Sequence, residues 1–188
     1  MSAFLTLLGY FPRRCIRPGN WHAAPQVTAI CSVSSCINDV PRGWLKHWLH
    51  NEWGFYNTHR DSLAVIPPEE TGYEILAYRL LPVRFHKGLS QPLSINGVAP
   101  EPLPASYQSL GYDIVNKTDS AFCECSPLSC NSLAQDIPVN ACCLVDTLEV
   151  AVALARKFSR EEPEPGPYFV IEVLRESAPA SAETSPRS

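Results

Sequence analysis

The sequence predicts an α+β fold in which a mainly antiparallel sheet is covered on one face by a helix from the C-terminal half of the chain. Three observations lead to this prediction. Residues 148–162 have the apolar spacing of an amphipathic helix, residues 168–176 are rich in β-branched and aromatic side chains, and the expected strands and helices do not alternate regularly. With 188 residues, the chain has the length of one domain, which we place at residues 41–176.

Residues 1–40 show no sustained hydrophobic period and are interrupted by Pro12, Pro18 and Pro25. We therefore expect a poorly ordered N-terminal extension with one short strand in the stretch QVTAICSV. One hypothesis is that translation starts downstream of Met1 and that this segment is not part of the native protein. The arginines near the N-terminus follow the apolar run instead of preceding it, so we do not expect a secretory signal.

Residues 43–56, GWLKHWLHNEWGFY, are expected to contain a short amphipathic helix because their tryptophans and leucines recur at helical spacing. An exposed aromatic surface is typical of a binding site, although an aromatic stripe more often belongs to a core. The candidate binding residues of this segment are Trp44, His47, Trp48, Trp53 and Tyr56. His47 and His50 lie three residues apart and, with His59, form a less favoured candidate metal set.

In the next part of the chain, prolines are expected to end a helix, bend a strand and exclude regular structure from a loop. HRDSLAVI is expected to add a helical turn before Pro67, and GYEILAYRLLPVRF is expected to form a strand that bends at Pro82. Further prolines predict a long surface loop at residues 87–109. Residues 112–117 are then expected to pair with residues 121–125 as a hairpin.

The amphipathic segment at 148–162 is the clearest element of the sequence. A short Pro-Gly loop connects it to the expected strand at 168–176, so we expect the helix and the strand to pack directly on each other. Residues 177–188 are polar and rich in serine, and we expect a disordered tail there.

Composition narrows the classes of partner. A net charge of −4 and a pI near 5.7 argue against binding to nucleic acid or to an anionic membrane surface. No run of apolar residues is long enough for a transmembrane helix. Without a secretory signal we expect a cytoplasmic protein, whose 8 cysteines are free or bound to metal instead of forming disulfides.

Several of these cysteines fall in the stretch AFCECSPLSCNSLA, with the spacing Cys123-x-Cys125-x4-Cys130. Structural zinc takes four such ligands, and Cys142 is the candidate fourth ligand, with Cys143 as the alternative. Cys123 and Cys125 can reach the same ion only if the strand ends or bulges between them. The spacing also lacks the C-x2-C pair of strong zinc motifs, so zinc is a cofactor that the sequence permits but does not firmly imply.

Two other interpretations of the cysteines stay open. A catalytic thiol needs a base, a cation or a helix N-terminus beside it; Cys142 and Cys143 precede the expected helix, and Cys130 beside Asn131 is another candidate. Alternatively, the cysteines are small buried apolar side chains, which is a common environment for a free cysteine. Packing is favoured over the two chemical interpretations by a narrow margin.

Three short blocks carry a resemblance: GYD at residues 111–113, ECSPLSCN at residues 124–131 and PEPGPY at residues 163–168. Through them, residues 43–175 resemble a group of bacterial proteins of unassigned activity that share the GYD…ECSPLSCN block. The resemblance implies no activity and identifies no catalytic residues.

The sequence contains no dinucleotide-binding, P-loop, hydrolase-elbow or zinc-protease motif. We therefore expect a small binding domain without catalysis, which holds a protein or a small ligand through the segment 43–56 and the loop 87–109. The alternative is a thiol-dependent enzyme or a zinc-binding domain centred on residues 123–143.

Overall fold

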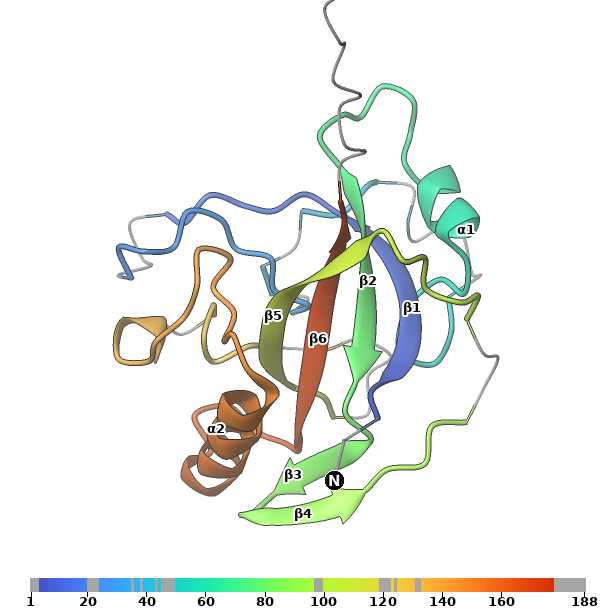
Figure 1. Ribbon diagram of the computed structural model, residues 1–188. Helices are drawn as coiled ribbons and strands as arrows, with labels where there is room; N and C mark the ends of the chain where they lie inside the picture. The colour runs from blue at the N-terminus through green and yellow to red at the C-terminus, as the bar shows by residue number, and fades with distance from the viewer. Residues whose placement is uncertain are drawn as a thin grey trace, which may run out of the picture.

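The computed structural model describes residues 4–19, 24–34, 36–37, 39–42, 44, 50–96, 100–118, 123, 125–130 and 133–177. These residues form a 6-stranded sheet in which the paired strands are antiparallel (Figure 1). The strands are β1 (Thr6–Arg13), β2 (Glu74–Leu80), β3 (Val83–His86), β4 (Leu89–Pro92), β5 (Tyr107–Asn116) and β6 (Tyr168–Glu176). The helices are α1 (His59–Ala64), α2 (Leu148–Glu161) and the short 3-10 helix η2 (Leu133–Gln135). The predicted α+β fold is confirmed.

Strand β6 lies at the centre of the sheet. It pairs with β5 on one side and with β2 on the other, and β1 pairs with the outer side of β2 (Figure 1). Next to Pro82, the Leu81 N–H donates to the Val170 carbonyl at 3.0 Å. Beyond the proline, β3 meets β6 at Phe85 and Tyr168 and then turns back as the β3–β4 hairpin. The chain therefore bends at Pro82, as predicted.

Helix α2 covers one face of the sheet (Figure 1). It buries Ala151, Ala155 and Phe158 in a core that includes Ile114 of β5 and Tyr168 of β6. The Phe158 and Tyr168 rings lie 6.0 Å apart between their centroids. The helix and strand that flank the Pro-Gly loop therefore pack on each other, as predicted. None of the helices in the described part of the chain combines the length and apolar character needed to cross a membrane.

The other face of the sheet is covered by aromatic side chains that precede α1. Trp53 meets the Phe169 ring of β6 edge-on at 5.4 Å between centroids, and Phe55 lies 4.7 Å from the Tyr78 ring of β2. These side chains belong to a second core of buried residues. The sheet thus lies between α2 and an aromatic layer.

The N-terminal segment corrects the prediction of a poorly ordered extension over residues 1–40. Residues 6–13 form β1, which pairs with β2 along its whole length, and several side chains of residues 24–34 are buried. The strand has no alternation of polar and apolar residues because it is buried on both faces from Leu8 onward. Pro12 is compatible with β1 because a proline can occupy an edge strand.

Two expectations in the middle of the chain need correction. Strand β5 pairs along its length with β6. Of its expected partner, residues 121–125, residues 121, 122 and 124 lie outside the described residues, and Cys125 meets the end of β5 where the Asn116 N–H donates to the Cys125 carbonyl at 2.9 Å. The expected loop at 87–109 contains β4, which pairs with β3. Of the helix expected in 43–56, residues 50–53 are described and are not helical, whereas residues 43 and 45–49 lie outside the described residues. The tail expected at residues 178–188 also lies outside them.

Candidate functional site

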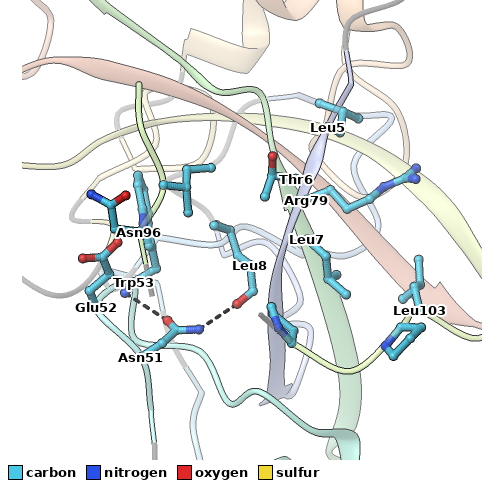
Figure 2. Close-up of a pocket in the computed structure, with 13 residues that line it drawn as sticks. Leu5, Thr6, Leu7, Leu8, Asn51, Glu52, Trp53, Arg79, Asn96 and Leu103 are labelled. Atoms are coloured by element: carbon cyan, nitrogen blue, oxygen red, sulfur yellow. Dashed lines mark hydrogen bonds between the residues drawn. The ribbon is translucent and has the colours of Figure 1, made fainter. Parts of the chain in front are cut away.

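A cavity of about 430 Å³ lies beside the edge strand β1 (Figure 2). Its walls come from β1 and the residue before it, from residues 51–53, and from the chain between β4 and β5. The apolar lining includes Leu5, Leu7, Leu8, Trp53, Ile95 and Leu103. A concave, mostly apolar space of this size is typical of a small-molecule site.

Asn51 ties two walls of this cavity together. Its Oδ1 accepts hydrogen bonds from the backbone N–H of Trp53 at 3.0 Å and of Phe55 at 3.3 Å. Its Nδ2 donates to the Leu8 carbonyl of β1 at 2.8 Å (Figure 2). The same nitrogen donates to Asn57 Oδ1 at 3.1 Å. One side chain therefore joins the wall that carries Trp53 to the wall formed by β1.

A few polar side chains also line the cavity. Arg79 forms an ion pair with Glu172, in which Nε and Nη2 lie 2.6 and 2.5 Å from Glu172 Oε2. Glu172 is buried, whereas the Arg79 side chain is 35% exposed. A guanidinium has five N–H donors, so this ion pair leaves donors of Arg79 for a second acceptor. Glu52 and Asn96 are exposed and line the same cavity.

The predicted binding residues are placed in different environments. Trp53 is buried and lines the cavity. Tyr56 is fully buried, and its hydroxyl donates to the Trp44 carbonyl at 3.3 Å. The half-buried Trp44 ring packs on Phe11, 5.9 Å away between centroids. His47 and Trp48 lie outside the described residues.

A second candidate site is a group of three thiols, Cys36, Cys125 and Cys130, which we call the thiol centre. Their Sγ atoms all lie within 4.8 Å of one another, and those of Cys36 and Cys125 are 2.8 Å apart. Cys36 is exposed, and the other two are half-buried. Thiols from sequence-distant segments are thereby brought close enough to bind one metal ion.

Asp113 of β5 holds the two loops that carry the thiol centre. The side chain is fully buried. Its Oδ2 accepts hydrogen bonds from Ser32 Oγ at 2.7 Å and Val33 N–H at 3.0 Å, and its Oδ1 accepts one from Ser126 Oγ at 2.6 Å. Burial raises the pKa of Asp113, while the hydrogen bonds from Ser126, Ser32 and Val33 oppose that rise.

Asn116, at the end of β5, fixes the backbone of Cys125. The Asn116 Oδ1 accepts a hydrogen bond from the Cys125 backbone N–H at 2.6 Å, and the Asn116 backbone N–H donates to the Cys125 carbonyl at 2.9 Å. Its Nδ2 donates to the Pro165 carbonyl at 2.7 Å. Both backbone polar groups of Cys125 are therefore satisfied by one buried side chain and its backbone.

The structure changes the membership of the predicted metal set. Cys125 and Cys130 lie together as expected, but Cys123 is buried in the aromatic core and Cys142 lies elsewhere, beside Cys31. Their place is taken by Cys36, which is 89 positions from Cys125 in the sequence. No local spacing could have identified Cys36, because the contact depends on the tertiary fold.

Cys15, Cys31 and Cys142 form a second group of thiols around Arg175. Arg175 Nη2 lies 3.5 Å from Cys15 Sγ and 3.8 Å from Cys31 Sγ, and also donates to Glu74 Oε1 at 2.7 Å. Hydrogen bonding from the Cys31 thiol lowers the pKa of Cys142 to about 7, with a smaller contribution from Arg175, and burial opposes both. The pKa of Cys31 is raised by the same hydrogen bond. Cys142 therefore ionises before Cys31.

Comparison with known proteins adds no family to these observations. No protein-family model, no curated protein and no solved structure matches the chain. The functional argument therefore rests on the geometry of the two candidate sites.

Proposed function

We propose that this chain binds a small, largely apolar molecule in the cavity beside β1. The observation that carries the proposal is the cavity itself, about 430 Å³ in volume, with an apolar lining and few polar groups. Two of its walls belong to the segments from which the sequence predicts binding, namely 43–56 and 87–109. Its size favours a small molecule over a protein surface as the ligand.

The polar groups of the cavity indicate the chemistry of the ligand. The charge of Arg79 is balanced by the buried Glu172, so the cavity does not need an anionic ligand to neutralise it. The remaining N–H donors of Arg79 suit a carbonyl or another uncharged acceptor. Glu52 adds a negative charge to the lining, which further disfavours an anion. We therefore propose an uncharged ligand with an apolar body and at least one hydrogen-bond acceptor.

Catalysis by a thiol is the weaker candidate. Among the described residues, the thiol centre contains only cysteines and includes no histidine that could serve as their base, so the candidate nucleophile is Cys142, whose pKa is lowered to about 7. All 8 cysteines are free, which fits the reducing cytoplasm that we propose as the location of the protein.

The test uses prodan, an uncharged naphthalene dye with one carbonyl acceptor, whose emission shifts to the blue in an apolar site. We expect saturable binding with a blue shift. Leu103→Trp places an indole in the cavity, and we expect it to weaken binding at least about 10-fold, equivalent to about 1.4 kcal/mol. Leu63→Trp is the matched control because Leu63 is 53% exposed on α1, and it should leave the affinity unchanged.

Near-ultraviolet circular dichroism establishes that each variant is folded, since prodan also binds loosely packed states. Absence of saturable binding, or equal affinity in the Leu103→Trp variant and the wild-type protein, would refute the proposal.

A further inference from the structure

The thiol centre has the composition and spacing of a metal site. Three sulfur atoms lie within 4.8 Å of one another, and they come from two segments of the chain that are far apart in sequence. We infer that Cys36, Cys125 and Cys130 bind one Zn²⁺ ion as thiolates. This site is separate from the cavity beside β1, and the inference does not depend on the function proposed for that cavity.

The third sulfur, and not the separation of the closest pair, distinguishes a metal site from a disulfide here. Two thiolates on one tetrahedral zinc ion lie about 3.8 Å apart, whereas the sulfurs of a disulfide lie about 2.05 Å apart. Cys36 and Cys125 Sγ are 2.8 Å apart, which lies between these two values, and they would separate by about 1 Å to share an ion. A disulfide would involve two of the sulfurs and would leave the convergence of Cys130 on the same point unexplained.

Hydrogen-bond donors surround Cys130, as they do around thiolates that bind metal. The Ser126 N–H donates to Cys130 Sγ at 3.3 Å. Ser34 Oγ lies 3.2 Å from the same sulfur and accepts a hydrogen bond from the Cys36 N–H at 3.1 Å. Either atom can donate while Cys130 is a thiol, but once Cys130 is a thiolate only the Ser34 hydroxyl can donate in this contact. One serine thus links the sulfur of one ligand to the backbone of another.

Buried hydrogen bonds anchor the two loops beneath the thiols. Asp113 joins Ser32 and Val33 of the first loop to Ser126 of the second, and Asn116 clamps the backbone of Cys125. These anchors are buried, so the loops are held without the metal. A preformed site loses less conformational entropy on binding than a flexible one.

The ligand set identifies the class of ion. Thiolates select zinc and other soft ions and are poor ligands for magnesium or calcium. Cys36 is exposed, so an ion can enter from solvent, and three protein ligands leave a fourth coordination position for water or another donor. Each thiol that binds as a thiolate releases its proton, so the affinity rises with pH.

The test begins with reduced, metal-free protein and measures Zn²⁺ binding by competition with a chromophoric chelator. We expect one ion per chain. Co²⁺ in place of Zn²⁺ should give sulfur-to-metal charge-transfer absorption that Zn²⁺ abolishes. Each of Cys36→Ser, Cys125→Ser and Cys130→Ser should weaken Zn²⁺ binding by about 100-fold or more, since even the loss of an outer-shell partner costs about 10- to 100-fold. Cys142→Ser is the matched control and should bind as the wild-type protein does.

A second measurement on the unmodified chain does not depend on the folding of variants. Iodoacetamide labelling, mapped by mass spectrometry, should show that Zn²⁺ protects Cys36, Cys125 and Cys130 and leaves the labelling of Cys15 and Cys142 unchanged. Absence of binding, protection of a different set of cysteines, or a Cys36–Cys125 disulfide that persists in reductant and excludes Zn²⁺ would each overturn the inference.

Discussion

Removal of the Asp113 carboxylate is the perturbation that most directly tests how the thiol centre is held. In the Asp113→Ala variant, the hydroxyls of Ser32 and Ser126 and the N–H of Val33 lose their acceptor in a buried environment. Each unsatisfied buried donor costs about 1–3 kcal/mol, which gives about 3–9 kcal/mol for three donors. Because the serine hydroxyls can rotate toward other acceptors, we expect the lower half of this range, about 3–6 kcal/mol.

The assay is urea unfolding of the reduced protein in the presence of a chelator, so that metal binding does not contribute to the free energy of unfolding. Asp136→Ala is the matched control because Asp136 is exposed, and its effect should stay within about 0.5 kcal/mol. A loss below about 1 kcal/mol in the Asp113→Ala variant would refute the account of Asp113 as the anchor of both loops.

The same residue predicts a pH dependence whose sign follows from its pKa. Burial raises the pKa of Asp113 in the folded state, so the folded chain binds more protons than the unfolded chain between the ordinary and the raised value. The contribution of Asp113 to stability is therefore fully present below the ordinary carboxyl pKa and decreases as the pH rises through this window. Relative to Asp113→Asn, the wild-type protein should lose stability with rising pH there, and a difference of opposite slope would contradict the assignment.

Two further predictions concern other parts of the molecule. With a pKa of about 7, Cys142 is about half ionised at pH 7, against about 1% for an ordinary thiol. A less basic thiolate is also less nucleophilic, so the alkylation of Cys142 at pH 7 should be about 6-fold faster than that of an ordinary thiol, with a midpoint near pH 7. The rate is measured for each cysteine by mass spectrometry. A rate for Cys142 no faster than that for Cys130 would contradict this prediction. Gly9→Ala should destabilise the fold by about 2–4 kcal/mol, because the added Cβ would lie 2.3 Å from the Tyr56 carbonyl oxygen at a φ of +134°. In the control Gly72→Ala, the atom nearest to the added Cβ is Arg14 Nε at 3.4 Å, so only the penalty of a positive φ remains, about 1 kcal/mol. Urea unfolding measures the free energy of unfolding of both variants. Equal losses in the two variants would argue against the close contact at Gly9.

Local patterns predicted the elements that depend on local interactions. The amphipathic spacing of α2 and the β-branched composition of β6 are properties of single segments, and both elements were placed correctly. Strand β1 was missed because it is buried on both faces, so its sequence lacks the alternation that identifies a half-buried strand. The partner of β5 was missed for another reason: pairing between distant strands is decided by the tertiary fold and not by the turn that follows β5.

In the candidate sites too, contacts within one segment follow from the local sequence, whereas contacts between distant segments depend on the tertiary fold. The adjacency of Cys125 and Cys130 follows from the tight turn between them, in which the Cys130 N–H donates to the Ser126 carbonyl at 2.7 Å. Cys36 reaches them through the tertiary fold, in which the Val33 N–H of its loop donates to Asp113 of β5. The cavity beside β1 also combines distant segments, so the sequence could indicate Trp53 and the loop before β5 but not the wall formed by β1.

The central claim of a small-molecule site beside β1 is tested most directly by methyl-resolved nuclear magnetic resonance of the wild-type protein titrated with prodan. The account predicts saturable shifts in the methyl groups that line the cavity, including those of Leu7, Leu8, Ile95 and Leu103, with the methyls of α2 unaffected. Shifts confined to other methyl groups, or no saturable shifts at all, would contradict it.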